Sequence, residues 1–293
     1  LENAETFDAW LTAKQRYETL FEIKPTCLAC DVHPEYLATK WAREQSREHA
    51  LPLVEVQHHH AHVVATMAEH GLAGPVCGMA FDGTGYGMDG SIWGGEVLLC
   101  NLQAFERFAN FAYVPMPGGA AAVKHPLRMA YGVLWAFDLL NHPGAADALD
   151  MLGEQAAICE QMIDRGLNTP MTSSVGRLFD AASALLGICV EPTYEGEPAI
   201  LLEAALRGSA GEGAGEPVSH QTRDRATEHA ESVSQADVTE RYTIDIVKNT
   251  ATQESTAQDT SVVLLDAAPV FQALLDDKVA GVPVQVIAQR FHD

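Results

Sequence analysis

The sequence lacks any run of about 18 apolar residues, and it has no basic N-terminus leading into an apolar segment. It is also poor in basic residues, because 18 Lys and Arg stand against 40 Asp and Glu, which gives a formal net charge of −22. So acidic a chain repels phosphate backbones, which argues against nucleic acid as a direct partner. With 293 residues and 47% hydrophobic composition, the sequence predicts a soluble, cytoplasmic globular protein without a membrane partner.

Cysteine is also scarce, and its spacing does not suggest a disulfide framework. The six cysteines lie mostly in apolar surroundings, which favours buried, reduced thiols. Cys27 and Cys30 have the spacing of half a zinc ribbon, but no second pair of this kind follows. A metal role for this pair is therefore disfavoured.

The first 70 residues alternate between helix and strand patterns. Apolar periodicity and proline or glycine boundaries predict helices at 5–21, 34–49 and 58–71, and strands at 26–31 and 52–56. This order predicts a largely parallel sheet covered by helices. Beyond residue 75 the pattern becomes that of a meander with glycine-rich turns, with strands predicted at 76–81, 91–102 and 105–114. Later helices are predicted from Pro126, after Ser174 and at 197–207.

Residues 208–260 differ in kind from the rest, since they are rich in Gly, Ser, Thr, Glu, Gln and Asp. They predict a polar, disordered insertion between a domain over 1–207 and a resumed fold over 261–293. The chain also lacks an initiator Met, and its last amphipathic helix pattern stops at Asp293. Both features predict a piece of a longer protein.

The histidine cluster at 58–62 is the most informative feature. His58 and His62 are four residues apart, so a helix places them on one face, one turn apart. Neutral imidazole is the commonest metal ligand in proteins. The alternative is a polar helix start with structural histidines, but four histidines in five residues at a strand exit favour a metal or catalytic use.

A second motif follows the apolar strand that ends at Phe81. Asp82 leads into Gly83, Thr84, Gly85, Tyr86 and Gly87. A glycine turn lets backbone N–H groups approach a phosphate, and the aspartate can hold a cation. A plain hairpin turn explains the same residues equally well.

A third motif places Asp180 within an otherwise apolar helix face, with a glycine- and glutamate-rich segment at 194–198 downstream. Asp180 is either solvated or able to hold a pair of sugar hydroxyls. No nucleophile elbow, Walker A loop or HExxH motif is present.

Taken together, these motifs resemble the HypF carbamoyltransferases of [NiFe]-hydrogenase maturation, in their Kae1-like domain. The matching strings are VQHHHAH at 56–62, DGTGYG at 82–87, WGGE at 93–96, HPLRMA at 125–130, SSVGRLFDA at 173–181 and RFH at 290–292. The resemblance implies an α/β, actin-like ATPase fold of the ASKHA class, with a complete first lobe and a partial second lobe.

The resemblance also implies the chemistry. Carbamoyl phosphate and ATP form carbamoyl-adenylate in a YrdC-like domain, and the Kae1-like domain transfers the carbamoyl group to the C-terminal cysteine of the partner HypE. The product is the source of the cyanide ligands of the hydrogenase. The acylphosphatase, zinc-finger and YrdC-like domains of the same chain are further implied partners.

Site residues follow from the resemblance position by position. His58, His62 and Asp82 match the family's metal ligands, and such a set suits zinc or iron. Nucleotide and phosphate binding is implied for Gly83, Thr84, Gly85, Gly87, Asp180 and Gly196. No catalytic residue is implied. The family continues past 292 with a glycine-rich segment and another aspartate ligand, so we expect an incomplete site and low activity for these residues alone.

Two other functions stay open at this point. One is a Kae1/TsaD-like transferase that acts on tRNA, which the acidic charge and the histidine string disfavour. The other is a nucleotide- or metal-binding module without catalysis of its own.

Overall fold

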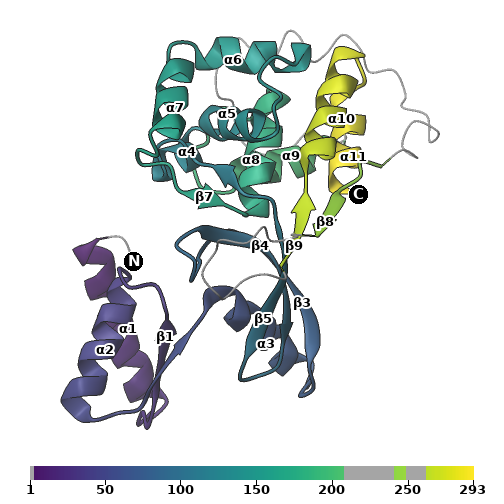
Figure 1. The fold of residues 1–293 in the computed structure, drawn as a ribbon. Coiled ribbons are helices and arrows are strands. Elements are labelled where there is room, and N and C mark those ends of the chain that lie inside the picture. The colour runs from purple at the N-terminus through teal and green to yellow at the C-terminus, as the bar shows by residue number, and fades with distance from the viewer. Residues whose placement is uncertain (1–2, 208–240, 249–261) are drawn as a thin grey trace.

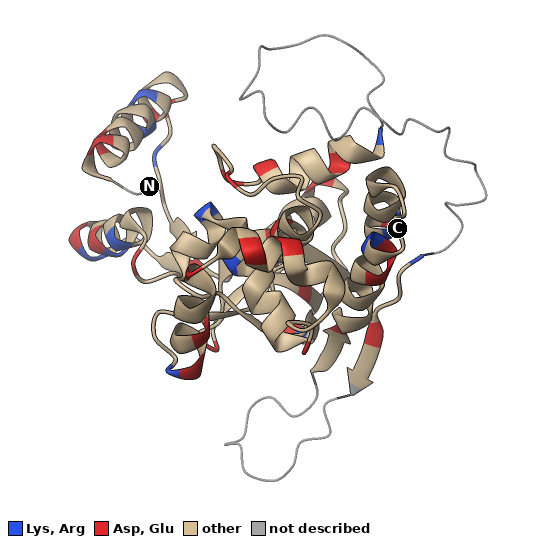
Figure 2. Cartoon of the chain, turned by 90° about the horizontal axis from the view of Figure 1, so that it is seen from above, with Lys and Arg blue, Asp and Glu red and all other residues tan. Residues whose placement is uncertain are grey.

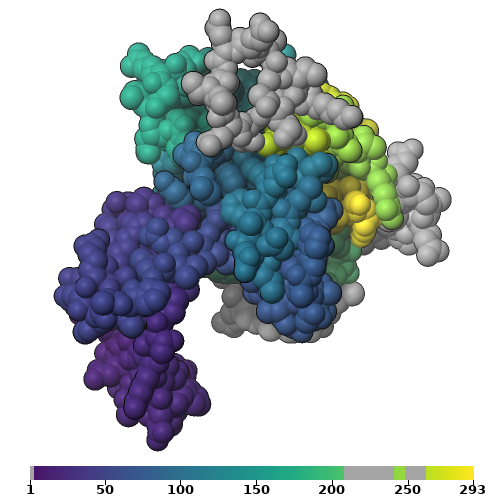
Figure 3. All heavy atoms as spheres, turned by 60° about the horizontal axis from the view of Figure 1, so that its bottom comes forward, coloured from purple at the N-terminus to yellow at the C-terminus, as the bar shows by residue number. Residues whose placement is uncertain are grey.

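The computed structural model describes residues 3–207, 241–248 and 262–293 as a mixed α/β fold (Figure 1). The N-terminal part contains α1 (Ala4–Leu20), β1 (Leu28–Asp31), α2 (Leu37–His49), β2 (Leu53–Val56) and α3 (His58–Glu69). Strands β1 and β2 pair in parallel, with Leu28 opposite Leu53, which confirms the predicted parallel strand order. The first elements, α1, β1 and α2, protrude from the body of the molecule, as the purple spheres in Figure 3 show, whereas α3 packs against two strands of the central sheet, Val76–Tyr86 and Ile92–Cys100.

Two side-chain caps define where helices begin in this part. The Asn3 side chain accepts a hydrogen bond from the Thr6 backbone N–H at 2.8 Å and begins α1. The Gln57 side chain does the same for the His60 N–H at 2.9 Å and begins α3. Helix α3 therefore begins directly after β2, so the histidine cluster occupies its first turns.

A seven-stranded sheet lies at the centre of the described residues. Its meander consists of β3 (Val76–Tyr86), β4 (Ile92–Cys100) and β5 (Phe105–Phe111), all antiparallel. Short strands β6 (Val114–Pro115) and β7 (Met171–Thr172) extend one side through β4. Strands β9 (Val263–Asp266) and β8 (Asp245–Lys248) extend the other side through β5.

The position of strand β8 shows that the predicted disordered insertion at 208–260 is wrong for residues 245–248. Asp245–Lys248 pairs antiparallel with β9, with Val247 opposite Leu264, so these residues belong to the sheet. Ile244, Ile246 and Val247 are apolar and Asp245 between them is polar, a pattern that suits an edge strand. The polar residues before and after this short segment made it look like part of the insertion. The rest of the predicted insertion, at 208–240 and 249–260, lies outside the described residues.

Helices cover the sheet and form the main core. They are α4 (Ala120–Lys124), α5 (Pro126–Ala136), the 3₁₀ turn η1 (Pro143–Ala145), α6 (Ala146–Leu152), α7 (Gln155–Asp164), α8 (Val175–Leu185), α9 (Glu197–Leu206), α10 (Ala268–Val279) and α11 (Val284–His292). Helix α8 is central, and its Ala181, Ala182 and Ala184 are fully buried. Small side chains let neighbouring helices approach closely, while large ones such as Leu134 and Phe271 fill the remaining space and stabilise the fold by about 1.5–3 kcal/mol each.

The acidic residues that give the chain its negative net charge are spread over many elements. Figure 2 shows Asp and Glu spread over helices and connections, with fewer Lys and Arg between them. Among the described residues, no helix has the length and apolar character needed to span a membrane. All six cysteines are free thiols; Cys100, Cys159 and Cys189 are buried as expected, whereas Cys27 and Cys77 are exposed.

Candidate metal and nucleotide site

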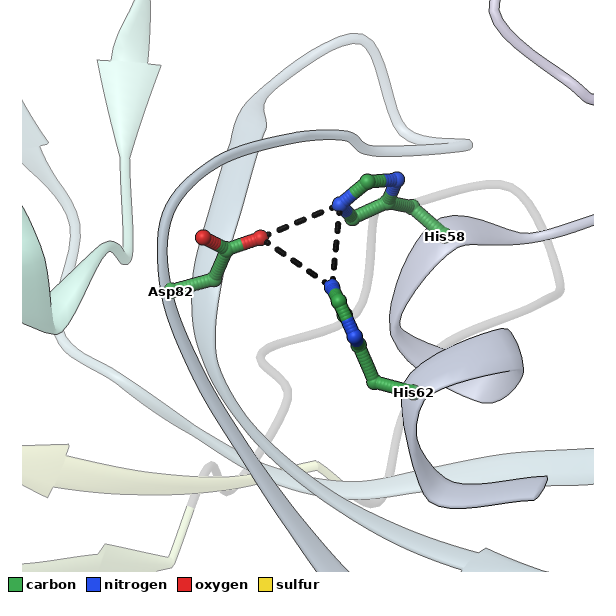
Figure 4. Close-up of side chains that lie close together, drawn as sticks. All are labelled: His58, His62 and Asp82. Atoms are coloured by element: carbon green, nitrogen blue, oxygen red, sulfur yellow. Dashed lines mark hydrogen bonds and ion pairs between the residues drawn. The ribbon is translucent and has the colours of Figure 1, made fainter. Parts of the chain in front are cut away.

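The predicted metal ligands come together beside the start of α3. His58 and His62 project from successive turns of the helix toward Asp82 on β3 (Figure 4). The His58 Nε2 atom lies 3.1 Å from Asp82 Oδ2 and 3.2 Å from His62 Nε2, and His62 Nε2 lies 3.5 Å from the same carboxylate oxygen. We call these three residues the metal triad.

The donor set of the triad fits a divalent metal. Ligand atoms around a tetrahedral zinc with bonds of 2.0–2.1 Å are about 3.3–3.4 Å apart, close to the separations found here. Within the described ranges, this is the one group of three or more His, Cys, Asp or Glu side chains with such convergence, and it does not include Cys27 or Cys30. Binding of a metal by the triad stays a prediction.

Asp31 supports the triad from behind. Its Oδ2 atom lies 2.9 Å from His58 Nδ1, so the N–H at Nδ1 donates to this carboxylate and leaves Nε2 free to bind a metal. Asp31 ends β1, and β1 is held beside β2 by parallel pairing. Asp31 was not among the residues predicted for the site; the signal for it is an acidic residue directly after an apolar run, the same pattern that pointed to Asp82.

Without a metal, His58 of the triad is protonated at neutral pH. The hydrogen bond to Asp82, followed by the one to Asp31, raises the pKa of His58 to about 9 against the opposing effect of burial. The hydrogen bond from His58 likewise lowers the pKa of Asp82 to about 2. A cation that binds the triad must therefore displace the proton from His58 Nε2.

His59 is buried beneath the triad, and its neighbours determine its tautomer. The Gln57 side-chain oxygen Oε1 accepts from the His60 N–H, so the NH₂ group of the same amide faces His59 Nδ1 at 3.4 Å. Nδ1 is then the acceptor, and the ring N–H is at Nε2, 3.7 Å from Asp82 Oδ2. Among the described residues Nε2 has no hydrogen-bond partner. Burial, followed by the charge of His58, lowers the pKa of His59 to about 4, so the ring is neutral.

The predicted glycine turn is wrong in one respect. Residues 83–86 belong to strand β3, and the hairpin turn comes after Gly87. The pairing with β4 shifts register between Phe81 and Gly85, so the strand bulges where the turn was predicted. We call residues 83–87 the glycine segment.

Close packing accounts for two of these glycines. A Cβ atom on Gly85 would lie 2.2 Å from His59 Cε1, and one on Gly87 would lie 2.4 Å from the Trp93 ring. Thr84 lines a cavity of about 650 Å³ together with Lys124, His125, Pro192–Glu195 and other residues. Phosphate binding by Gly83, Thr84, Gly85 and Gly87 stays a prediction, because packing alone explains part of the motif.

Helix α8 is anchored directly to this segment. The Ser174 hydroxyl lies 2.6 Å from the Asp82 carbonyl oxygen and 2.8 Å from that of Gly83, and its oxygen accepts from the Arg177 N–H. A Cβ on Gly176 would lie 2.8 Å from the Gly83 Cα, so the first turn of α8 packs against the glycine segment. The α8 N-terminus therefore lies at the same place as Asp82.

Asp180 lies one turn further along α8 and is almost fully buried, at 2% exposure. Its Oδ2 atom forms an ion pair with Arg177 Nη2 at 3.2 Å. Burial raises the pKa of Asp180 to about 6, although the Arg177 charge opposes this. Gly196 has φ +87° at the N-cap of α9, one residue after Glu195, which reaches toward Arg177. The roles predicted for Asp180 and Gly196 stay predictions, and the nucleotide-binding arrangement would need Asp180 to be uncovered.

A second buried network surrounds Glu96, which the sequence showed only as part of a WGGE string. Its Oε2 atom accepts from the Gly94 and Gly95 N–H groups at 2.7 and 2.8 Å, and Oε1 accepts from Arg107 Nη2 at 2.9 Å. Burial raises the pKa of Glu96. Arg107 also lies over the Trp93 ring at 4.0 Å. The network lies beside His59, whose ring stacks on that of Trp93 with 6.2 Å between the centroids.

Comparison with known proteins gives matches along the whole chain. Residues 78–293 match the family model described as "Carbamoyltransferase, Kae1-like Domain, second subdomain", and residues 1–69 match the "HypF Kae1-like domain". Among curated proteins, carbamoyltransferase HypF2 of Cupriavidus necator is 40% identical over 206 residues, which cover 69% of this chain and 25% of that protein. Carbamoyltransferase HypF of Rhodobacter capsulatus is 39% identical over 210 residues, or 70% of this chain and 28% of that protein.

Solved structures show the same relationship. A full-length HypF in its phosphate- and nucleotide-bound form matches with a TM-score of 0.77 and 32% identity over 100% of this chain and 39% of that chain. The HypF of T. kodakarensis matches with a TM-score of 0.74 and 28% identity over 99% and 34%. The α/β fold expected from the resemblance is confirmed. The chain spans about a quarter of the length of the two curated relatives.

Proposed function

The chain belongs to the HypF carbamoyltransferase family through its Kae1-like domain, and from this premise we propose that it transfers a carbamoyl group from carbamoyl-adenylate to the C-terminal cysteine of HypE. The carbamoyl-adenylate is made from carbamoyl phosphate and ATP by a YrdC-like domain. Transfer to HypE supplies the carbon and nitrogen of the cyanide ligands of [NiFe]-hydrogenase. The reaction takes place in the cytoplasm.

The transfer exchanges one acyl bond for another. The cysteine sulfur, after loss of its proton to solvent, forms a bond with the carbamoyl carbon. The bond between that carbon and the phosphate oxygen breaks, and AMP leaves with the electron pair. No oxidant or reductant is needed, so the site has to bind an adenylate, orient its carbonyl and stabilise the negative charge that develops there.

The observation that carries this proposal is the metal triad beside the glycine segment in a chain of this family. His58 and His62 would hold zinc or iron together with Asp82, and Asp31 orients His58 for that purpose. A bound divalent ion supplies charge that neutralises phosphate and polarises a carbonyl oxygen. Asp82 also connects the triad to the glycine segment, since its Oδ1 atom accepts from the Gly83 N–H at 2.6 Å.

The nucleotide part of the proposal rests on the residues beside Asp82. The glycine segment, the N-terminus of α8 and the cavity lined by Thr84 lie next to one another. A HypF with 32% identity to this chain is described as phosphate- and nucleotide-bound, which supports an adenylate here. We assign Gly83, Thr84, Gly85, Gly87, Asp180 and Gly196 to this ligand.

Carbamoyl transfer can be tested by mass spectrometry of HypE. Residues 1–293 are grafted into the Cupriavidus necator HypF2 in place of the matching region, and the graft is incubated with HypE, carbamoyl phosphate and ATP. We expect HypE to gain one carbamoyl group, and HypE with its C-terminal cysteine replaced by serine to gain none. We expect residues 1–293 alone, supplied with carbamoyl-adenylate, to transfer weakly.

The controls separate the reaction from the fold. The graft with His70→Ala, at the end of α3 and outside the triad, should transfer as well as the unmodified graft. A folded graft that leaves HypE unmodified while native HypF2 modifies it contradicts the proposal. Full transfer by a His58→Ala/His62→Ala graft contradicts the metal role of the triad.

A further inference from the structure

Arg177, in the first turn of α8, is a buried cation with too few acceptors. Its side chain is 2% exposed, and Asp180 Oδ2 lies 3.2 Å from its Nη2 atom. Among the described residues, neither Nε nor Nη1 has a hydrogen-bond partner. Three of the five N–H bonds of the guanidinium belong to these two nitrogens.

Such an arrangement is costly for a folded protein. Buried polar groups are nearly always paired, and a charged donor without an acceptor loses its hydration with nothing in return. Asp180 alone cannot satisfy a guanidinium whose N–H groups point in several directions. The Asp180 oxygen can accept only one of the two N–H bonds of Nη2, so this nitrogen also keeps a donor for an acceptor that binds from outside the chain.

The surroundings of Arg177 show which acceptor fits. A Cβ placed on Gly83 would lie 3.4 Å from Arg177 Nη2, so the guanidinium is directly behind the glycine segment. Ser174 holds the α8 N-terminus to the carbonyl groups of Asp82 and Gly83, which brings the positive end of an 11-residue helix to the same place. Both features favour an anion with several oxygen atoms.

An anionic side chain already lies at this position. Glu195 Oε1 lies 4.0 Å from Arg177 Nη2, and 3.5 Å from the place of a Cβ on Gly83. Its side chain is 63% exposed, and no hydrogen bond to another described residue is found for it. A loosely held carboxylate at the edge of a buried guanidinium can be replaced by a better anion.

We propose that Arg177 is a phosphate-binding residue: its guanidinium contacts a phosphate oxygen of the nucleotide, and Glu195 occupies that place when no nucleotide is bound. The inference rests on the proposed function, because the nucleotide is the adenylate named there. Arg is suited to phosphate because its planar donors match the spacing of phosphate oxygens. Displacement of Glu195 moves the segment just before Gly196 and opens the way to Arg177.

The test compares AMP with adenosine, which differ only in the phosphate group. Both are titrated calorimetrically into residues 1–293, without carbamoyl phosphate or HypE. We expect AMP to bind at least about tenfold more tightly than adenosine, as a charge-assisted hydrogen bond provides. Arg177→Gln should bring the ratio of AMP affinity to adenosine affinity to about one, and Arg177→Lys should give an intermediate ratio.

Glu195→Gln supplies a second arm that does not disturb the core. Removal of the competing carboxylate should raise AMP affinity about threefold or more and leave adenosine unchanged. Glu203→Gln, on the exposed face of α9 where Glu203 pairs with Arg207 at 2.8 Å, is the matched control and should change neither.

Several results would overturn the inference. These are equal AMP and adenosine affinities in the unmodified chain, an unchanged AMP-to-adenosine ratio in folded Arg177→Gln, or a parallel loss of both ligands, which is the mark of a structural pair with Asp180 or of a buried water on Arg177. If Arg177→Gln does not fold, Glu195→Gln decides, and an AMP affinity equal to that of the unmodified chain counts against the inference. A failure of carbamoyl transfer leaves these binding results unaffected.

Discussion

The metal triad on α3 and the Arg177–Asp180 pair on α8 are both charged clusters beside the bulged strand β3, but they differ in their access to water. The His62 side chain is 58% exposed, whereas Arg177 and Asp180 are each 2% exposed. In the accessible triad, the possible metal-ligand atoms lie close to one another. In the buried pair, the Arg177 Nε and Nη1 groups have no hydrogen-bond acceptor among the described residues. The same strand thus lies beside the site that we predict for a cation and the site that we propose for an anion.

The predicted loss of metal binding is the largest effect and tests the triad. His58→Ala/His62→Ala removes two of three ligands, so zinc binding to residues 1–293 should fall below detection in a competition titration with a chromophoric chelator. His70→Ala, at the C-cap of the same helix, should bind zinc as the unmodified chain does. Unchanged zinc affinity in the double variant would place the metal elsewhere.

Loss of stability tests the buried pair. Arg177→Met leaves Asp180 without its partner, and breaking a buried pair should lower the free energy of unfolding by about 3–5 kcal/mol in urea denaturation. Lys40→Met, which breaks the exposed pair with Glu35, should leave the free energy of unfolding almost unchanged, because water screens exposed pairs. Equal small losses in both variants would show that water reaches Arg177.

The pH dependence of zinc affinity follows from the proton held by His58. Because the pKa of His58 is raised to about 9, zinc has to displace a proton at any lower pH. Apparent zinc affinity should therefore rise about tenfold per pH unit from pH 6.5 to 8.5 and level off above 9. A flat profile over this range would mean that zinc does not bind at His58 Nε2.

A smaller effect is expected for Asp31, which contacts His58 but not the metal position. Asp31→Asn keeps the size of the side chain and weakens its hold on the His58 Nδ1–H, so zinc affinity should fall by about 10- to 100-fold. Asp245→Asn, on edge strand β8, is the matched control for charge loss. A loss as complete as in the double histidine variant would make Asp31 a direct ligand.

The sequence predicted the local parts of this molecule well. The helix at 58–69 and the i, i+4 pair on it depend only on neighbouring residues, so the triad half on α3 follows from spacing. The parallel β1–β2 pair was also confirmed, because strand–helix–strand order constrains it.

The errors lie where distant segments decide the outcome. Glycine usually interrupts strands, yet Gly85 continues β3 because it pairs with Trp93 of β4. The His59 ring leaves no room for a side chain at this position. Asp31 lies 27 residues before His58, and only the β1–β2 register brings it close. Nothing in the local sequence distinguishes Arg177 from an exposed helix residue; only the fold shows that it is buried next to Gly83.

The contact between His59 and Gly85 has a consequence for the evolution of this family. A Cβ at position 85 would overlap the imidazole ring, so position 85 cannot gain a side chain unless residue 59 becomes smaller. An alignment of related sequences should show the two positions covarying, with a small residue at 59 wherever 85 carries a side chain. The second residue of the histidine string therefore limits which residues position 85, 26 positions later in the chain, can accept.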